Sequence, residues 1–76
     1  MTEEETKKHL YEHDPEFRRL KEKHQKYKEE IGRIEAHSFL TPEQEMEEKQ
    51  IKKKKLQLKD QMQEMIKAFQ FSQAKT

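Results

Sequence analysis

The sequence predicts an all-α protein, an antiparallel helical hairpin preceded by a short N-terminal helix. The 76 residues are rich in Glu, Lys and Gln and contain one Gly and two Pro, a composition that favours long helices. Val and Trp are absent and Ile is scarce, which disfavours a sheet. Apolar residues recur at alternating steps of three and four, the spacing of one helix face. We expect a single domain over 1–76, because the chain is too short for two.

The first two helices are predicted from their starting residues. Thr2 offers an N-cap with Glu5 three residues later, so we expect a short helix over 3–13. Asp14-Pro15-Glu16 places an N-cap acceptor, a proline and an acid in order, which predicts a long helix over 15–36.

The third helix begins after Thr41-Pro42-Glu43-Gln44, which repeats this pattern and adds a capping box. We expect this helix over 42–70. The connection over 36–40 is short, so the two long helices are predicted to lie antiparallel. Phe39 and Leu40 are expected to fold back over the open end of the hairpin.

A heptad stripe is the predicted core of the hairpin. On the first half it consists of Leu10, His13, Phe17, Leu20, His24, Tyr27, Ile31 and Ile34, which we expect to run without a break. On the second half it contains Ile51, Lys55, Leu58, Met62, Met65 and Phe69. Folding the chain about its turn pairs Tyr27 with Ile51, Leu20 with Leu58, Phe17 with Met62 and Leu10 with Phe69.

The same register places two polar members of the stripe, His24 and Lys55, opposite each other. We interpret His24 as a packing residue whose ring nitrogen finds a partner across the hairpin. The alternative is a pH switch, because a His that faces a Lys resists protonation.

Some apolar residues are left uncovered by a lone hairpin. Leu56 lies off the stripe, and Ile66 flanks it near the C-terminal end of the chain. Met side chains adapt to partner surfaces. We therefore predict a dimer contact or a partner site there, formed by Leu56, Met62, Met65, Ile66 and Phe69, with Phe71 also exposed. A hairpin with so little apolar surface is marginal alone, so we expect a homo-oligomer, a dimer or higher, or a complex with a partner helix.

Composition excludes several classes of function. Seventeen basic and sixteen acidic residues leave a net charge of +1, unlike a general polyanion binder. There is no Cys, and no apolar run is long enough for a signal peptide or a membrane span, so we expect a cytoplasmic location. Two helices enclose no pocket for catalysis, so we predict no enzyme activity, no cofactor and no small-molecule substrate.

Two motifs are candidates for ligand binding, one for a metal ion and one for nucleic acid. His9 and His13 are four apart, the spacing at which two imidazoles on one helix face share a metal ion. We predict no metal site, since His13 is also a stripe residue and His9 a solvated one.

The run Lys52–Lys55, extended to Lys49, suggests an alternative function as a small nucleic-acid-associated regulator. Four consecutive helical residues form a ring around the helix, not one phosphate-facing stripe, and no aromatic residues are interleaved with them. We therefore favour a structural or interaction module.

Two segments are similar to the YdcH-like family of small bacterial proteins. Asp14-Pro15-x-Phe17-x-x-Leu20 is followed by Lys23-His24, Tyr27 and Ile31, and the more specific stretch is Lys53-Lys54-Lys55-Leu56-Gln57-Leu58-Lys59-Asp60-Gln61-Met62. The resemblance covers about residues 10–66. It implies a helical hairpin prone to coiled-coil packing, with a domain-of-unknown-function label and no catalytic residues. It also implies that Leu56 belongs to the family's own pattern.

Overall fold

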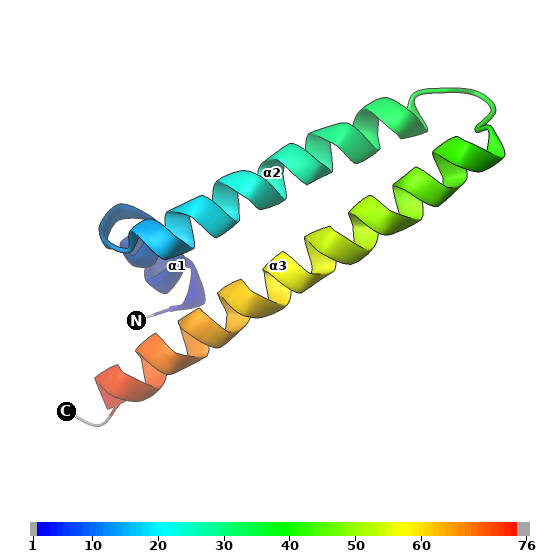
Figure 1. The fold of residues 1–76 in the computed structure, drawn as a ribbon. Coiled ribbons are helices and arrows are strands. Elements are labelled where there is room, and N and C mark those ends of the chain that lie inside the picture. Colours follow the sequence, from blue (N-terminus) through cyan, green and yellow to red (C-terminus); the bar gives the residue numbers. More distant parts are fainter. Residues whose placement is uncertain (1, 75–76) are drawn as a thin grey trace.

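Three helices account for nearly all of the residues that the computed structural model describes, residues 2–74. They are α1 (Glu3–His13), α2 (Pro15–Glu35) and α3 (Pro42–Ala74). The predicted all-α fold is confirmed, and the predicted bounds agree to within one residue except that α3 continues four residues beyond 70. The molecule is elongated, 53 × 19 × 17 Å, with α2 and α3 side by side and antiparallel (Figure 1).

Local capping explains where each helix begins. Thr2 and Glu5 form the reciprocal capping box of α1, and the Asp14 carboxylate accepts hydrogen bonds from the backbone N–H groups of Glu16 and Phe17. Thr41 Oγ1 accepts from the backbone N–H of Gln44 at 3.1 Å, while Gln44 Oε1 accepts from that of Thr41 at 2.9 Å. Each start therefore satisfies donors that a helix leaves unpaired.

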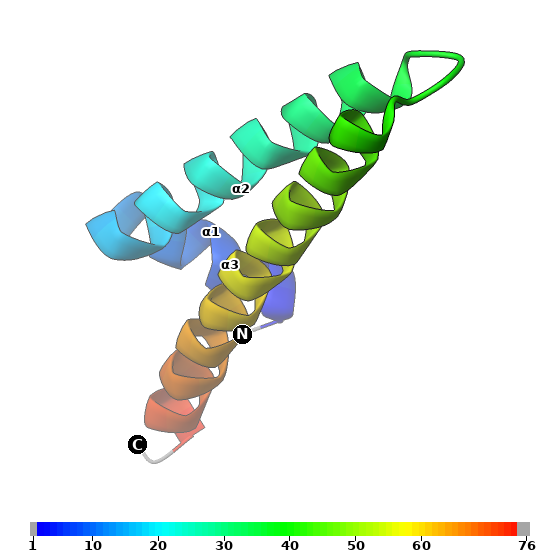
Figure 2. The same cartoon turned by 45° about the vertical axis from the view of Figure 1, so that its right-hand side comes forward.

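The backbone changes direction at Asp14, which adopts an extended conformation with φ −116° and ψ 106°. The residue before a proline avoids the helical region, so α1 ends here. The first helix then folds back and packs against both α2 and α3 at the end of the hairpin opposite the turn (Figure 2). The Arg18 side chain stabilises this change of direction. It donates hydrogen bonds to the backbone carbonyl oxygens of Tyr11, at 2.9 Å, and Glu12, at 3.0 Å.

The expectation of one unbroken stripe from Leu10 to Ile34 is therefore wrong. His13 is exposed, and Leu10 enters the core from a separate helix. There it joins Phe17 and Ile66 in a cluster against which Met62 and Phe69 also pack. The four residues of the predicted pairs Leu10–Phe69 and Phe17–Met62 thus belong to one cluster between three helices.

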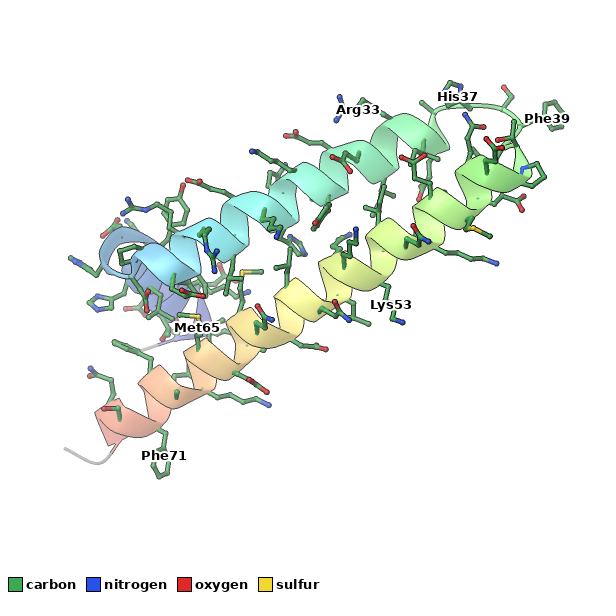
Figure 3. The ribbon with its side chains drawn as sticks, viewed as in Figure 1. Arg33, His37, Phe39, Lys53, Met65 and Phe71 are labelled. Carbon is green, nitrogen blue, oxygen red and sulfur yellow. The ribbon has the colours of Figure 1, made fainter. Side chains whose placement is uncertain are left out.

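Along the rest of the hairpin the predicted core residues lie at the interface of α2 and α3. Leu20, Ile31, Ile51 and Leu58 are buried, and His24, Tyr27 and Ile34 are half-buried. The connection differs from expectation. Phe39 is 91% exposed and points away from the turn, whereas Leu40 is half-buried (Figure 3). The buried residues closest to Phe39 in sequence, Ile31 and Ile51, lie within the helices and not in the connection.

Candidate interaction surface

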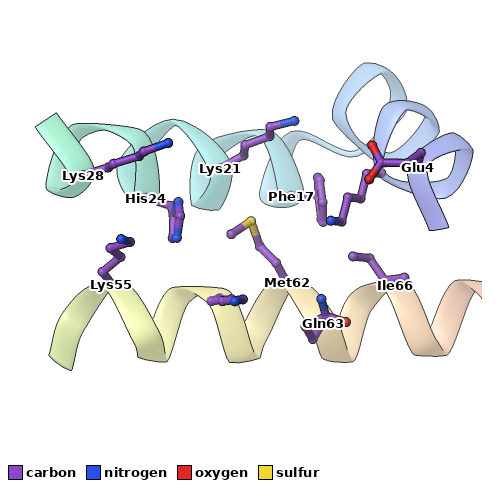
Figure 4. Close-up of a pocket in the computed structure, with 11 residues that line it drawn as sticks. Glu4, Phe17, Lys21, His24, Lys28, Lys55, Met62, Gln63 and Ile66 are labelled. Carbon is purple, nitrogen blue, oxygen red and sulfur yellow. The ribbon is translucent and has the colours of Figure 1, made fainter. Parts of the chain in front are cut away.

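A groove of about 410 Å³ runs along one side of the hairpin, between α2 and α3 and beside α1 (Figure 4). Phe17, Met62 and Ile66 supply its apolar lining. The charged residues around it are five lysines and one glutamate, namely Lys7, Lys21, Lys28, Lys55, Lys59 and Glu4. The groove is therefore strongly basic in a chain whose net charge is only +1.

Helical spacing brings these lysines together. Lys21 and Lys28 are two turns apart on α2, with His24 between them, and Lys52, Lys55 and Lys59 follow at steps of three and four on α3. Residues at these spacings share one face of a helix, so each helix contributes a row of ammonium groups. The consecutive run Lys52–Lys55 does not predict this arrangement, because the two rows combine lysines three, four and seven residues apart on different helices.

His24 lies between the two rows, opposite Lys55, as the register predicts (Figure 4). Burial, followed by the charges of Lys55, Lys28 and Lys59, lowers the pKa of His24 below its ordinary value. Its Nε2 atom is buried and has no hydrogen-bond partner among the described residues. The predicted partner across the hairpin is therefore not found for this nitrogen, which leaves a polar atom unsatisfied in the groove.

A second, shallower hollow continues this surface toward the turn. It is lined by His24, Lys52, Lys55, Leu56 and Lys59. Leu56 is 57% exposed, in agreement with its position off the heptad stripe. A large aliphatic side chain thus lies at the edge of a basic surface.

Lys52 marks the boundary of the basic region. Its ammonium group lies 3.2 Å from Glu48 and 3.3 Å from Glu35, so it links α3 to α2. Hydrogen bonds to Glu48 and then Glu35 raise the pKa of Lys52. Within the run Lys52–Lys55, one lysine is ion-paired, one lines the groove, and Lys53 and Lys54 are exposed, which fits a ring around the helix.

The opposite side of the hairpin has a different character. A hollow there is lined by Glu16, Leu20, Gln61, Glu64, Met65 and Ala68. Its two charged residues are both acidic. This hollow contains no lysine, in contrast to the groove with its five.

The predicted interaction residues at the C-terminal end of the core are placed differently from expectation. Ile66 is 2% exposed, and Met62, Met65 and Phe69 are partly buried against the cluster that it forms with Leu10 and Phe17. The expectation that one chain leaves Ile66 uncovered is wrong, because α1 folds over this end. Phe71 is exposed, as expected, at 64%.

The two histidines of α1 pack as rings. The His9 and His13 centroids are 4.5 Å apart, and His9 lies 4.9 Å from the Phe69 ring, joining α1 to α3. Within residues 2–74, no group of three or more His, Cys, Asp or Glu side chains is arranged to hold a metal ion. The arrangement of His9 supports a packing role instead of the solvated position expected for it.

Thr6 is a core residue that the apolar stripe does not predict, with an exposed fraction of 0%. Its hydroxyl donates to the backbone carbonyl of Thr2 at 3.0 Å, so a polar group is buried with a partner. The available signal was its position four residues before Leu10, on the same helix face.

In the part of the chain that the structure describes, no helix has the length and apolar character needed to cross a bilayer.

One of the comparisons with known proteins gave a match. A family model described as "Protein of unknown function (DUF465)" matches residues 17–66, which is consistent with the resemblance to the YdcH-like proteins. The matched segment holds most of α2, the turn and about the first three quarters of α3, including Leu56 and both lysine rows. No curated protein and no solved structure matches the chain.

Proposed function

The chain therefore belongs to this family of unknown function, and we propose that it is a non-catalytic module that packs against other helices, foremost against a second copy of itself. The proposed contact surface is the side of α3 around Leu56. The nature of the contact is helix-on-helix packing of the kind found in coiled coils.

The exposure of Leu56 is the observation that supports the proposal most. The core of one chain is completed without it, by residues from all three helices. Leu56 nevertheless remains 57% exposed in a sequence in which only 29% of residues are hydrophobic. Covering a leucine side chain stabilises a complex by roughly 1.5–3 kcal/mol when it is fully buried, so a partner helix would gain from it.

A catalytic role has less support. The grooves are open surfaces between helices, and the titratable residues of the main groove are five lysines, one glutamate and His24. Nothing in this set pairs a nucleophile with a base. We also assign the module to the cytoplasm as part of the same proposal.

Nucleic-acid binding by Lys49 to Lys55 is the weaker alternative. Lys52 is already paired with Glu48 and Glu35, and Lys53 and Lys54 do not line the groove that Lys55 faces. A row of unpaired charges, which phosphate binding requires, is not formed by this run.

Sedimentation equilibrium over a concentration series tests the proposal, with two leucine variants of identical chemistry. Leu58 is buried at the interface of α2 and α3, and Leu56 is two residues away on the exposed side. Leu58→Asp is expected to lower the free energy of unfolding by more than about 3 kcal/mol and so to melt the hairpin. Leu56→Asp is expected to leave the helical circular dichroism unchanged while weakening self-association.

Two outcomes contradict the proposal. The first is a wild-type protein that stays monomeric at tens of micromolar with a concentration-independent melting temperature. The second is a Leu56→Asp variant that remains folded and associates as strongly as the wild type.

A further inference from the structure

The side of the hairpin that carries Leu56 is divided into a basic and an acidic part. Lys52 lies next to residues of both the basic and the acidic part. It lines a hollow with Lys55, Leu56 and Lys59, and it also contacts Glu35 and Glu48. Since one ammonium group reaches both sets, the two glutamates border the same surface on the side nearer the turn. The lysine groove occupies the side nearer α1.

The basic part carries an excess of positive charge, although one of its lysines, Lys7, lies 3.9 Å from Glu3. Glu4 is the single acid among the residues that line the groove, against five lysines. Like charges in one groove repel one another, and partial burial together with these charges lowers the pKa of His24, so the ring remains neutral more readily. A partner that brings carboxylates to this surface would relieve the repulsion and approach the unsatisfied Nε2 atom.

The chain itself has the acid that the groove lacks. Its basic and acidic residues nearly balance, so the excess of lysine at the groove is matched by an excess of acid elsewhere. The segment 43–48 contains four glutamates and Met46, whose side chain is 64% exposed. An acidic segment with an exposed apolar side chain is the chemical complement of lysines beside an exposed leucine.

We propose that a second copy of this chain packs on this side in an antiparallel orientation, so that Glu35 and Glu48 of each copy face Lys28 and Lys59 of the other. This deepens the proposed function and rests on it. In two antiparallel copies, the acidic end of each copy lies against the basic end of the other. Unlike charges therefore face each other at two places. Lys52 and Leu56 lie between Glu48 and Lys59 in the sequence, close to the two-fold axis. Leu56 is then covered at the centre, and the charges set the register.

Charge reversal in two separate variants tests this arrangement. K28E/K59E removes the excess positive charge of the groove and places two carboxylates in it, and E35K/E48K makes the turn end of the same side basic. Each variant alone presents like charges to its own copy, so we expect its self-association to weaken by about tenfold or more. An equimolar mixture restores unlike pairs at both ends, so a heterodimer of wild-type affinity is expected in sedimentation velocity with one partner labelled by a fluorophore.

A matched control variant makes the same two charge changes at residues outside the proposed contact. K26E/K53E also replaces two exposed lysines by glutamate, and neither residue lines the groove or the Leu56 hollow. It is expected to associate as the wild type does. Circular dichroism of all variants establishes that each is folded. Raising the salt from 0.05 M to 0.5 M should weaken the wild-type dimer, because Lys28, Glu35 and Lys59 are exposed and salt screens their attraction.

The results separate the inference from the proposed function. A wild type that is monomeric at tens of micromolar overturns both. A wild type that associates while both folded variants associate equally well overturns the antiparallel arrangement alone. The same holds if both variants are weakened but their mixture is not restored. Retention of a short oligoglutamate or an RNA oligonucleotide by a monomeric wild type would assign the groove to a different acidic partner and overturn the inference.

Discussion

The two ends of the hairpin are built from similar helices but are packed to different degrees. At the end beside α1, three helices surround Phe17 and Ile66, which are 1% and 2% exposed. At the turn end only α2 and α3 are present, Ile31 and Ile51 are each 7% exposed, and Phe39 is almost fully in solvent.

The difference shows what a short third helix contributes to a small chain. Two helices share one strip of contact, whereas a third closes a cluster from another direction. Leu10 and Thr6 are the buried residues that α1 adds. We therefore expect the α1 end to hold most of the stability, and the turn end to open first in local unfolding.

The largest effect is expected for Phe17→Ala. The ring is fully enclosed by the core cluster, so its removal should lower the free energy of unfolding by about 3–5 kcal/mol through lost burial and a cavity. Urea denaturation followed by circular dichroism measures the change. Phe39→Ala is the matched control at the other end and should alter stability by less than about 0.5 kcal/mol. Similar losses for the two variants would refute the contrast between the ends.

Leu10→Ala should have the next largest effect, about 2–5 kcal/mol, and it should act locally. Leu10 attaches α1 to Phe17 and Ile66, so backbone amides of α1 and of the adjoining part of α3 should exchange with solvent faster. Hydrogen exchange followed by NMR distinguishes this from a uniform loss. Equal acceleration around Ile31 and Ile51 would mean that both ends unfold as one unit.

Gly32→Ala should stabilise the thinner end. Gly32 lies within α2, and a Cβ atom built there meets no other atom within 4 Å. Alanine loses less backbone entropy than glycine on forming a helix, so a gain of about 0.5–1 kcal/mol is expected. A raised melting temperature with unchanged association checks it, and a lowered one would indicate hidden crowding at this position.

The smallest expected effect is a pH dependence of stability that comes from His24, at the margin of the three-helix end. Its pKa is lowered in the folded chain by burial and by Lys55, from an ordinary value near 6.5. The unfolded chain therefore takes up this proton first as the pH falls. The contribution of His24 to stability is fully present above about pH 6.5 and is lost as the pH falls from there through the lowered pKa.

The melting temperature of the wild type should thus fall between pH 7.5 and pH 5.5 by more than that of His24→Gln. The comparison isolates His24 from the other three histidines. An equal fall in both proteins would show that the lysine groove does not affect the protonation of this residue.

The sequence by itself determined the helices and much of the hairpin. The caps at Thr2, Asp14 and Thr41 mark helix starts through local hydrogen bonds, which act over three or four residues and can be read from neighbours in the chain. The spacing of three and four likewise identified Phe17, Leu20, Ile31, Ile51 and Leu58 as buried, and placed His24 opposite Lys55. The exposure of Leu56 followed from the same spacing.

Only the tertiary structure decided where α1 goes. A heptad pattern continues across the Asp14-Pro15 junction in the sequence, but the extended backbone at Asp14 separates two helices that pack in different directions. This choice buried Ile66 and Thr6 and partly covered Met62 and Met65. It also decided the lysine groove, because Lys7, Lys28 and Lys59 come from three helices and are brought together by packing alone. Periodicity reports which face of a helix is apolar, whereas the neighbour of that face depends on long-range packing.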